Sequence, residues 1–237
     1  MKNRILLVCG LALFAGLAAT SLRVIRGQAP GRAGKVPTGA VAAHLVGRLA
    51  GNQNEFELIG YAAFVEGLGV PLFTGATGER TARVSFRTER FGLSVIPNGE
   101  AFHVTRLVSG SGAAPVVNVY FNPAPARDFA RPDTFSDGQL IGVLRPHSTQ
   151  GILVPGQMFR LAGSLEVESL APATIDNQSV SLGGLLDAAT ISFAGVPPTR
   201  AEFLAASAVS VPFSATVIAA DGASRAQLAV LPPRARR

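Results

Sequence analysis

The most constraining feature of this chain is a regular alternation of apolar and polar side chains, clearest at residues 159–168. Successive side chains of a β-strand point to opposite faces, so a period of two predicts a strand with one buried and one solvated face. Similar runs, such as 82–87 and 209–217, recur between turns rich in Gly, Pro and Asn. This patterning predicts many short antiparallel strands.

We therefore predict an all-β fold, which is either an antiparallel sandwich or a barrel of roughly 10–12 short strands. A single domain is expected at 40–224, because no repeat or linker interrupts that range. At most one short helix is expected, at 199–207, where the Thr199 hydroxyl suits a helix N-cap. Transmembrane barrels carry girdles of aromatic side chains. The absence of Trp and the presence of only two Tyr disfavour that class of barrel.

The N-terminus has the organisation of an export signal. Lys2 and Arg4 precede an uncharged apolar run, and small residues follow the run. This order is typical of a secretory signal peptide, which we predict at 1–21. Because Arg23 and Arg26 follow directly, an uncleaved membrane anchor is the alternative.

Export has consequences for the rest of the chain. Residues 22–39 are expected to be a flexible linker, and residues 225–237 a basic disordered tail. Cys9, the only cysteine, lies inside the apolar run, so the exported chain would have no disulfide and no thiol nucleophile. We expect the protein to be periplasmic, secreted or on the cell surface.

The net charge of +6 does not describe the folded part of the chain. Ten of the 21 basic residues precede residue 40 or follow residue 224, and the remaining eleven are outnumbered by fifteen acidic ones. A nucleic-acid-binding domain carries positive charge on its folded surface, so nucleic acid is not expected as a partner. The C-terminal tail could contact an anionic surface electrostatically.

The chain offers few residues for catalysis. His44, His103 and His147 are far apart and lack the close spacing of metal-ligand pairs. There is no Gly-x-Ser-x-Gly motif, and the range 40–224 has no Lys for a Schiff base. We therefore predict no metal and no other cofactor, and we favour a non-enzymatic role. A hydrolase with a scattered Ser/His/Asp set is an alternative, because such sets assemble from distant positions.

Residues 122–138 are too many for a hairpin turn and separate two apolar runs. Long loops held on a rigid sheet are where binding residues concentrate. Arginines suit a carboxylate or phosphate, and aspartates suit a hard cation. The candidate binding residues are therefore Arg127, Asp128, Arg131, Asp133 and Asp137. The alternative is that these charges pair with each other while the two phenylalanines of the loop plug one end of the sheet.

The sequence is compatible with three functional hypotheses. The first is an exported cell-envelope or secreted protein with a non-enzymatic binding or structural role. The second is a barrel that holds a small apolar ligand under loop 122–138 as a lid, which an apolar cavity above roughly 300 Å3 would favour. The third is the scattered hydrolase, which requires a serine or carboxylate beside a histidine in a cleft.

Overall fold

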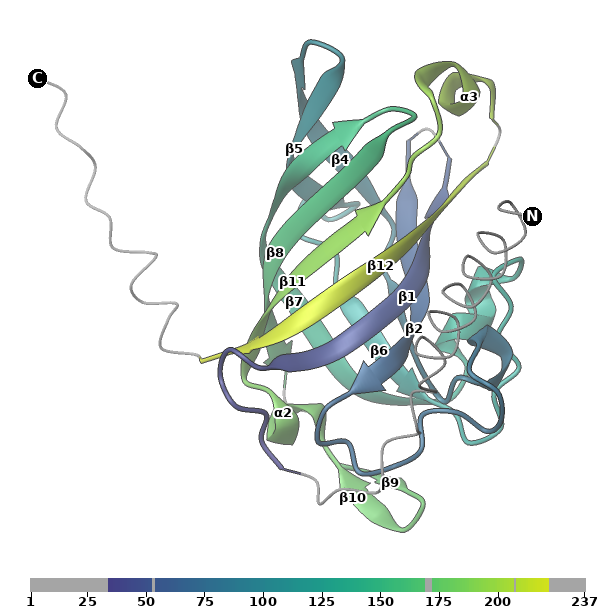
Figure 1. Ribbon diagram of the computed structural model, residues 1–237, viewed down its shortest axis with the longest axis vertical. Coiled ribbons are helices and arrows are strands. Elements are labelled where there is room, and N and C mark those ends of the chain that lie inside the picture. The colour runs from purple at the N-terminus through teal and green to yellow at the C-terminus, as the bar shows by residue number, and fades with distance from the viewer. Residues whose placement is uncertain (1–33, 53, 169–171, 207, 222–237) are drawn as a thin grey trace, which may run out of the picture.

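The computed structural model describes residues 34–221 with the exception of 53, 169–171 and 207. The predicted signal peptide and the predicted tail at 225–237 lie outside the described residues. The described part contains twelve strands, two α-helices and two 3-10 helices (Figure 1). The strands are β1 (Val41–Gly51), β2 (Phe56–Val65), β3 (Val84–Thr88), β4 (Phe91–Asn98), β5 (Ala101–Ser109), β6 (Val117–Phe121), β7 (Gln139–Val154), β8 (Met158–Glu168), β9 (Ala173–Ile175), β10 (Gln178–Val180), β11 (Ala188–Gly195) and β12 (Val209–Ala220), and the helices are η1 (Glu79–Thr81), η2 (Pro132–Ser136), α2 (Leu182–Leu185) and α3 (Arg200–Ala205).

Ten strands form one antiparallel sheet that closes on itself, because β1 pairs with both β2 and β12. The result is a closed barrel with eight strand positions. β3 and β4 lie end to end and together occupy one strand position of the barrel. β5 and β6 share the next position in the same way. Each position pairs with its neighbours in sequence, as in an up-and-down barrel. The predicted antiparallel all-β fold is confirmed, and its architecture is the barrel.

The alternation places apolar side chains in the lumen and polar ones on the outside. On β12, Val211, Phe213 and Ala215 are buried in the core, whereas Ser210 and Ser214 are exposed. Removal of apolar side chains from water is the main driving force for such a fold. Because the barrel is closed, most of the core lies inside one ring of strands, and the remainder comes from segments outside the ring, such as 68–72 and 173–180.

The two ends of the barrel differ. The end that we call the mouth carries the β1–β2, β4–β5 and β7–β8 turns together with α3, at the top of Figure 1. The opposite end, which we call the base, carries α2, the β9–β10 hairpin and both ends of the described chain. At the base, the Leu182 side chain of α2 occupies the space that a side chain at Gly142 would fill, so α2 packs against β7.

The structure differs from the expectations in two places. There are two short α-helices instead of at most one, since residues 182–185 complete a turn of helix at the base. The folded body also begins before residue 40. Val36 is buried, and its N–H donates to the carbonyl of Leu185 at 3.0 Å, so the end of the predicted linker 22–39 belongs to the core. Among the described residues, no helix combines the length and apolar character needed to cross a bilayer.

Candidate functional site

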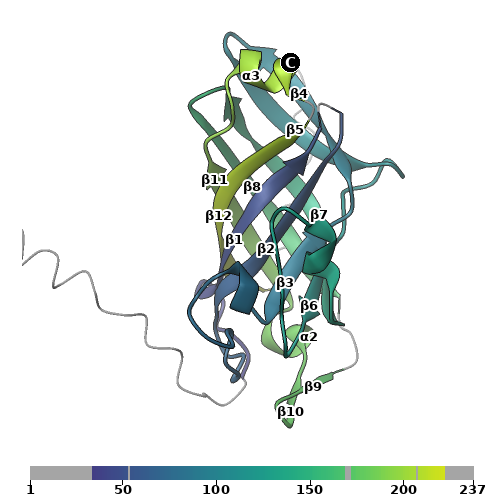
Figure 2. The same cartoon turned by 90° about the vertical axis from the view of Figure 1, so that its right-hand side faces the viewer.

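Loop 122–138 packs against the outer wall of the barrel, where η2 contacts β2 and β3 (Figure 2). The fully buried Ser85 hydroxyl donates to the carbonyl oxygen of Phe135 at 2.7 Å. Phe135 is also fully buried, and its ring stacks on that of Phe129 with 4.8 Å between centroids. No residue of the loop lines a cavity inside the barrel. The lid that we considered for this loop is therefore absent, because the loop covers the side of the sheet and neither of its ends.

Arg127 holds this loop in place. Its side chain is fully buried. Nε donates to the carbonyl of Ala82 at 3.0 Å, and Nη1 donates to that of Thr134 at 2.9 Å. Nη2 donates to the carbonyl of Arg83 at 3.2 Å. Burial lowers the pKa of the Arg127 guanidinium to about 10, against the opposing effect of the Asp137 carboxylate. With its donors used by main-chain carbonyls, Arg127 is not accessible to a ligand.

The other four candidate residues do not form one site. Arg131 Nε lies 3.4 Å from a carboxylate oxygen of Asp128 at the surface. The N–H of Ala130, and to a smaller extent Arg131, lower the pKa of Asp128. The side chains of Asp133 and Asp137 are exposed. In the described part of the chain, no three His, Cys, Asp or Glu residues gather as metal ligands would.

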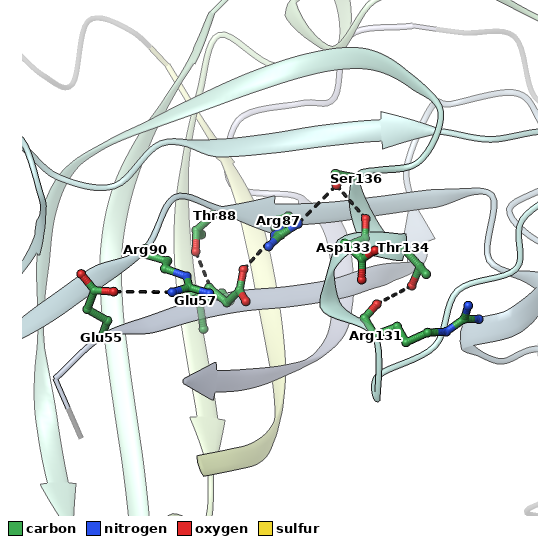
Figure 3. A network of polar contacts seen from close by, with 10 residues as sticks. Glu55, Glu57, Arg87, Thr88, Arg90, Arg131, Asp133, Thr134 and Ser136 are labelled. Carbon is green, nitrogen blue, oxygen red and sulfur yellow. Dashed lines mark hydrogen bonds and ion pairs between the residues drawn. The ribbon is translucent and has the colours of Figure 1, made fainter. Parts of the chain in front are cut away.

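A polar network joins the loop to the barrel wall (Figure 3). The carboxylate of Glu57, which is buried, accepts a hydrogen bond from Arg87 Nε at 2.8 Å, and Arg87 Nη1 donates to the Ser136 hydroxyl at 3.4 Å. Nearby, Arg90 and Glu55 are 3.7 Å apart. A shallow outer groove of about 400 Å3 lies between the loop and the β1–β2 turn. Both carboxylates that line the groove, those of Glu55 and Glu57, are paired with an arginine, so neither is left unpaired to hold an ion.

The three histidines lie on the outer wall, one each on β1, β5 and β7. His44 Nδ1 is 3.4 Å from the Thr216 hydroxyl, and His103 Nε2 is 3.2 Å from the Asn98 amide. His147 Nε2 is 3.1 Å from the Glu166 carboxylate. All three side chains are exposed, and none lines the cavities described below. The cavities inside the described barrel therefore contain no histidine that could act with a serine or carboxylate.

The mouth of the barrel holds an apolar pocket of about 450 Å3. Inward-facing side chains from several strands form its wall, and α3 forms part of its cover. Among the described residues, Asn54 and Arg200 are the only ones with polar side chains that line it. The main apolar contributors are Leu49, Phe56, Leu93, Phe102, Leu153 and Val211.

The short helix α3 is fixed at its N-terminus and by an aromatic contact to the barrel wall. The Thr199 hydroxyl accepts a hydrogen bond from the N–H of Glu202 at 3.2 Å, and the Glu202 carboxylate accepts one from the N–H of Thr199 at 2.8 Å. This reciprocal capping box satisfies main-chain donors at the start of the helix. The N–H of Thr199, followed by its hydroxyl, lowers the pKa of Glu202. Further along, the Phe203 ring stacks on that of Phe56 at 6.2 Å between centroids, which seats α3 on the pocket wall.

The rim of the mouth is also apolar. Eight large hydrophobic side chains are exposed in the described part of the chain, and five of them belong to the mouth end. Exposed apolar surface concentrated in one region usually marks a binding region. The mouth therefore has two features of a binding region, the apolar pocket inside it and the apolar side chains at its rim. The five are Val95, Ile96, Met158, Val196 and Leu204.

A second cavity lies inside the barrel toward the base and is lined almost entirely by apolar side chains. Val36 and Leu182 close it from the base end. Its volume of about 110 Å3 is well below the roughly 300 Å3 of ordinary small-molecule sites. The mouth pocket exceeds that size and is therefore the candidate functional site.

Comparisons of the chain with protein-family models, with curated proteins and with solved structures found no match. The geometry of the mouth is therefore the basis for assigning a function. Sequence reasoning missed this site, because its residues come from strands far apart in the chain. One local signal was present, since Thr199 and Glu202 have the spacing of a capping box beside Phe203.

Proposed function

We propose that the protein is an exported, non-enzymatic binding protein whose barrel takes up a small, mostly apolar molecule at the mouth. The observation that carries this proposal is the apolar pocket of about 450 Å3, a volume within the usual range for small-molecule sites. Burial of apolar surface would supply most of the affinity. Asn54 and Arg200 would orient one polar end of the ligand, as the few polar groups of such sites commonly do.

Export is part of the same proposal and rests on the residues that form the predicted signal at 1–21. A carrier of poorly soluble molecules outside the cell needs a closed, self-sufficient fold, because the exported chain would have no disulfide. The closed barrel meets that need, since closure leaves the ten-stranded sheet of the described chain without an edge strand.

A pair of neighbouring substitutions tests the pocket. Val95 lines the mouth pocket and is 40% exposed, so Val95→Trp would project a larger side chain into the pocket entrance. Ile96 is 58% exposed and does not line the pocket, so Ile96→Trp is the matched control. With N-phenyl-1-naphthylamine as a fluorescent probe, we expect V95W to weaken binding at least about tenfold, or ~1.4 kcal/mol. I96W should bind like the wild type.

Native mass spectrometry of the exported protein provides a second test. A bound molecule that survives purification, and that V95W lacks, would support the proposal. Absence of probe binding by the folded wild-type chain would overturn it.

A further inference from the structure

The interior of the barrel is divided into two separate apolar chambers. No residue lines both the mouth pocket and the cavity near the base. Along β12, Val211 belongs to the mouth pocket and Val217 to the base cavity. Phe213, which lies between them in sequence, lines neither. The division is therefore made by side chains that fill the lumen between the chambers.

Three phenylalanines are part of this filling. Phe91, Phe159 and Phe213 face the lumen from β4, β8 and β12, and none of them lines either chamber. Their exposed fractions are 2%, 2% and 5%, so they are buried within the core. Val104 on β5, 2% exposed, also lines neither chamber. We call Phe91, Phe159 and Phe213 the phenylalanine partition.

Glycines in the barrel wall make room for two of these rings. Phe213 pairs across the strands with Gly47, and Phe159 pairs with Gly195. A Cβ atom on Gly47 would lie 2.7 Å from Cζ of Phe213, and one on Gly195 would lie 2.5 Å from Cε1 of Phe159. Glycine within a strand commonly marks such a close approach. The wall and the rings are thus matched to each other at the level of the partition.

We propose that the phenylalanine partition sets the depth of the mouth pocket and thereby the longest ligand that the barrel accepts. The ligand class is then a compact apolar molecule with one polar end, and long acyl chains are excluded. This inference rests on the proposed function of the mouth pocket. Buried side chains in a close-packed core resist insertion of further atoms, because overpacking displaces side chains and backbone.

The test is a competition series in which n-alkanols from hexanol to hexadecanol displace N-phenyl-1-naphthylamine. For the wild type, affinity should rise about fourfold for each methylene buried and then stop rising when the mouth pocket is full. In the double variant Phe159→Ala/Phe213→Ala the chambers are joined, so the rise should continue to longer alkanols. Phe159→Leu and Phe213→Leu, which leave smaller voids and disturb folding less, should move the limit in the same direction.

Phe86→Ala is the matched control. Phe86 faces Gly60 in the same ring-over-glycine arrangement, but it lines the base cavity. This variant enlarges the base cavity and keeps all three phenylalanines of the partition, although it removes the ring that lies 6.3 Å from that of Phe213. Its chain-length limit should therefore stay much closer to that of the wild type than the limit of the double variant does. Circular dichroism establishes that each variant is folded.

The outcomes separate the two proposals. A limit that stays the same in all folded partition variants overturns the role of the partition while leaving the binding function intact. If the wild type binds neither the probe nor any alkanol, the proposed function is overturned. The role of the partition is then tested by alkanol binding to the double variant alone. Binding of long alkanols by that variant alone would support the partition, and no binding would overturn it.

Discussion

The aromatic ring of Phe213 lies against Gly47, its direct partner on the neighbouring strand β1. The arrangement repeats one strand further on, where Gly60 stands opposite Gly47 and beneath the ring of Phe86. The rings of Phe86 and Phe213 are 6.3 Å apart between centroids. Two aromatic side chains therefore cross the lumen where the wall itself carries no side chain, which keeps the interior filled without forcing the strands apart.

Substitution of Gly47 by Ala should destabilise the fold. The added methyl would contact the Phe213 ring and, more closely, the carbonyl oxygen of Ile59, which belongs to the main chain and cannot move aside. Overpacking of this kind costs about 1–3 kcal/mol. Gly110→Ala is the control, because nothing lies within 4 Å of a Cβ at that position. Urea unfolding should show a lower free energy of unfolding for G47A than for the wild type, and no change for G110A. Equal stability of the two variants would contradict the packing described.

Arg127→Met should destabilise the barrel by roughly 3 kcal/mol, because it leaves several buried carbonyl oxygens without a donor. The matched control is Arg131→Met on the same loop, whose side chain is 64% exposed and pairs with Asp128. Exposed ion pairs contribute little, so R131M should unfold at nearly the wild-type denaturant concentration. If R127M were as stable as R131M, the loop would not depend on the buried guanidinium.

Periodicity was sufficient to predict the strands but not the architecture. The alternation at 159–168 and 209–217 corresponds to β8 and β12, since each strand has one face in the lumen. The choice between sandwich and barrel depends on whether β1 pairs with β12. That pairing joins the two ends of the folded body and leaves no local pattern in the sequence. Closure was therefore beyond what periodicity can predict.

Loop 122–138 shows a different limit. The composition of this loop predicts either a ligand site or a set of ion pairs within the loop. The ion pair between Asp128 and Arg131 agrees with the second alternative. Arg127 follows neither expectation, because it binds main-chain carbonyls that only the folded barrel brings together. Phe135 is buried, as the plug hypothesis predicts. It covers the outer wall of the barrel, however, and not one end of the sheet.

The β9–β10 hairpin should become less firmly attached in acid. Arg83 donates from both Nη atoms to the Asp176 carboxylate, at 2.5 and 2.6 Å, and its hydrogen bonds hold the pKa of Asp176 below the usual range. A depressed pKa in the folded state means that the stabilisation is complete above the unfolded pKa of about 3.9 and is lost as the pH falls through the folded value.

Asp176→Asn measures this contribution. The variant should be less stable than the wild type at neutral pH, because Arg83 is 8% exposed and loses its counter-charge. The difference should shrink as the pH falls below about 4. Asp133→Asn, which removes an exposed carboxylate from loop 122–138, controls for loss of surface charge. A difference between D176N and wild type that does not change with pH would rule out titration of Asp176 as its source.

The last prediction links pH to the mouth pocket through Glu202. Its carboxylate accepts from the N–H and the hydroxyl of Thr199, each at 2.8 Å, and these bonds lower its pKa. The capping box is therefore intact above the unfolded pKa of about 4.3 and weakens as the pH falls through the lower folded value. Weakening the start of α3 would release Phe203 from Phe56 and open the cover of the pocket.

Two substitutions at Glu202 distinguish the hydrogen bonds from the charge. Glu202→Gln keeps an acceptor for the capping box but cannot titrate, whereas Glu202→Ala loses both. At neutral pH, E202Q should bind N-phenyl-1-naphthylamine somewhat more weakly than the wild type, because an amide oxygen is a weaker acceptor than a carboxylate, and E202A should bind it more weakly still. As the pH falls below about 4, wild-type binding should approach that of E202Q, because a protonated carboxyl keeps one carbonyl acceptor as the amide does, while E202Q stays unchanged. If the wild type and E202Q lost the probe in parallel, the acid effect would have to originate elsewhere in the barrel.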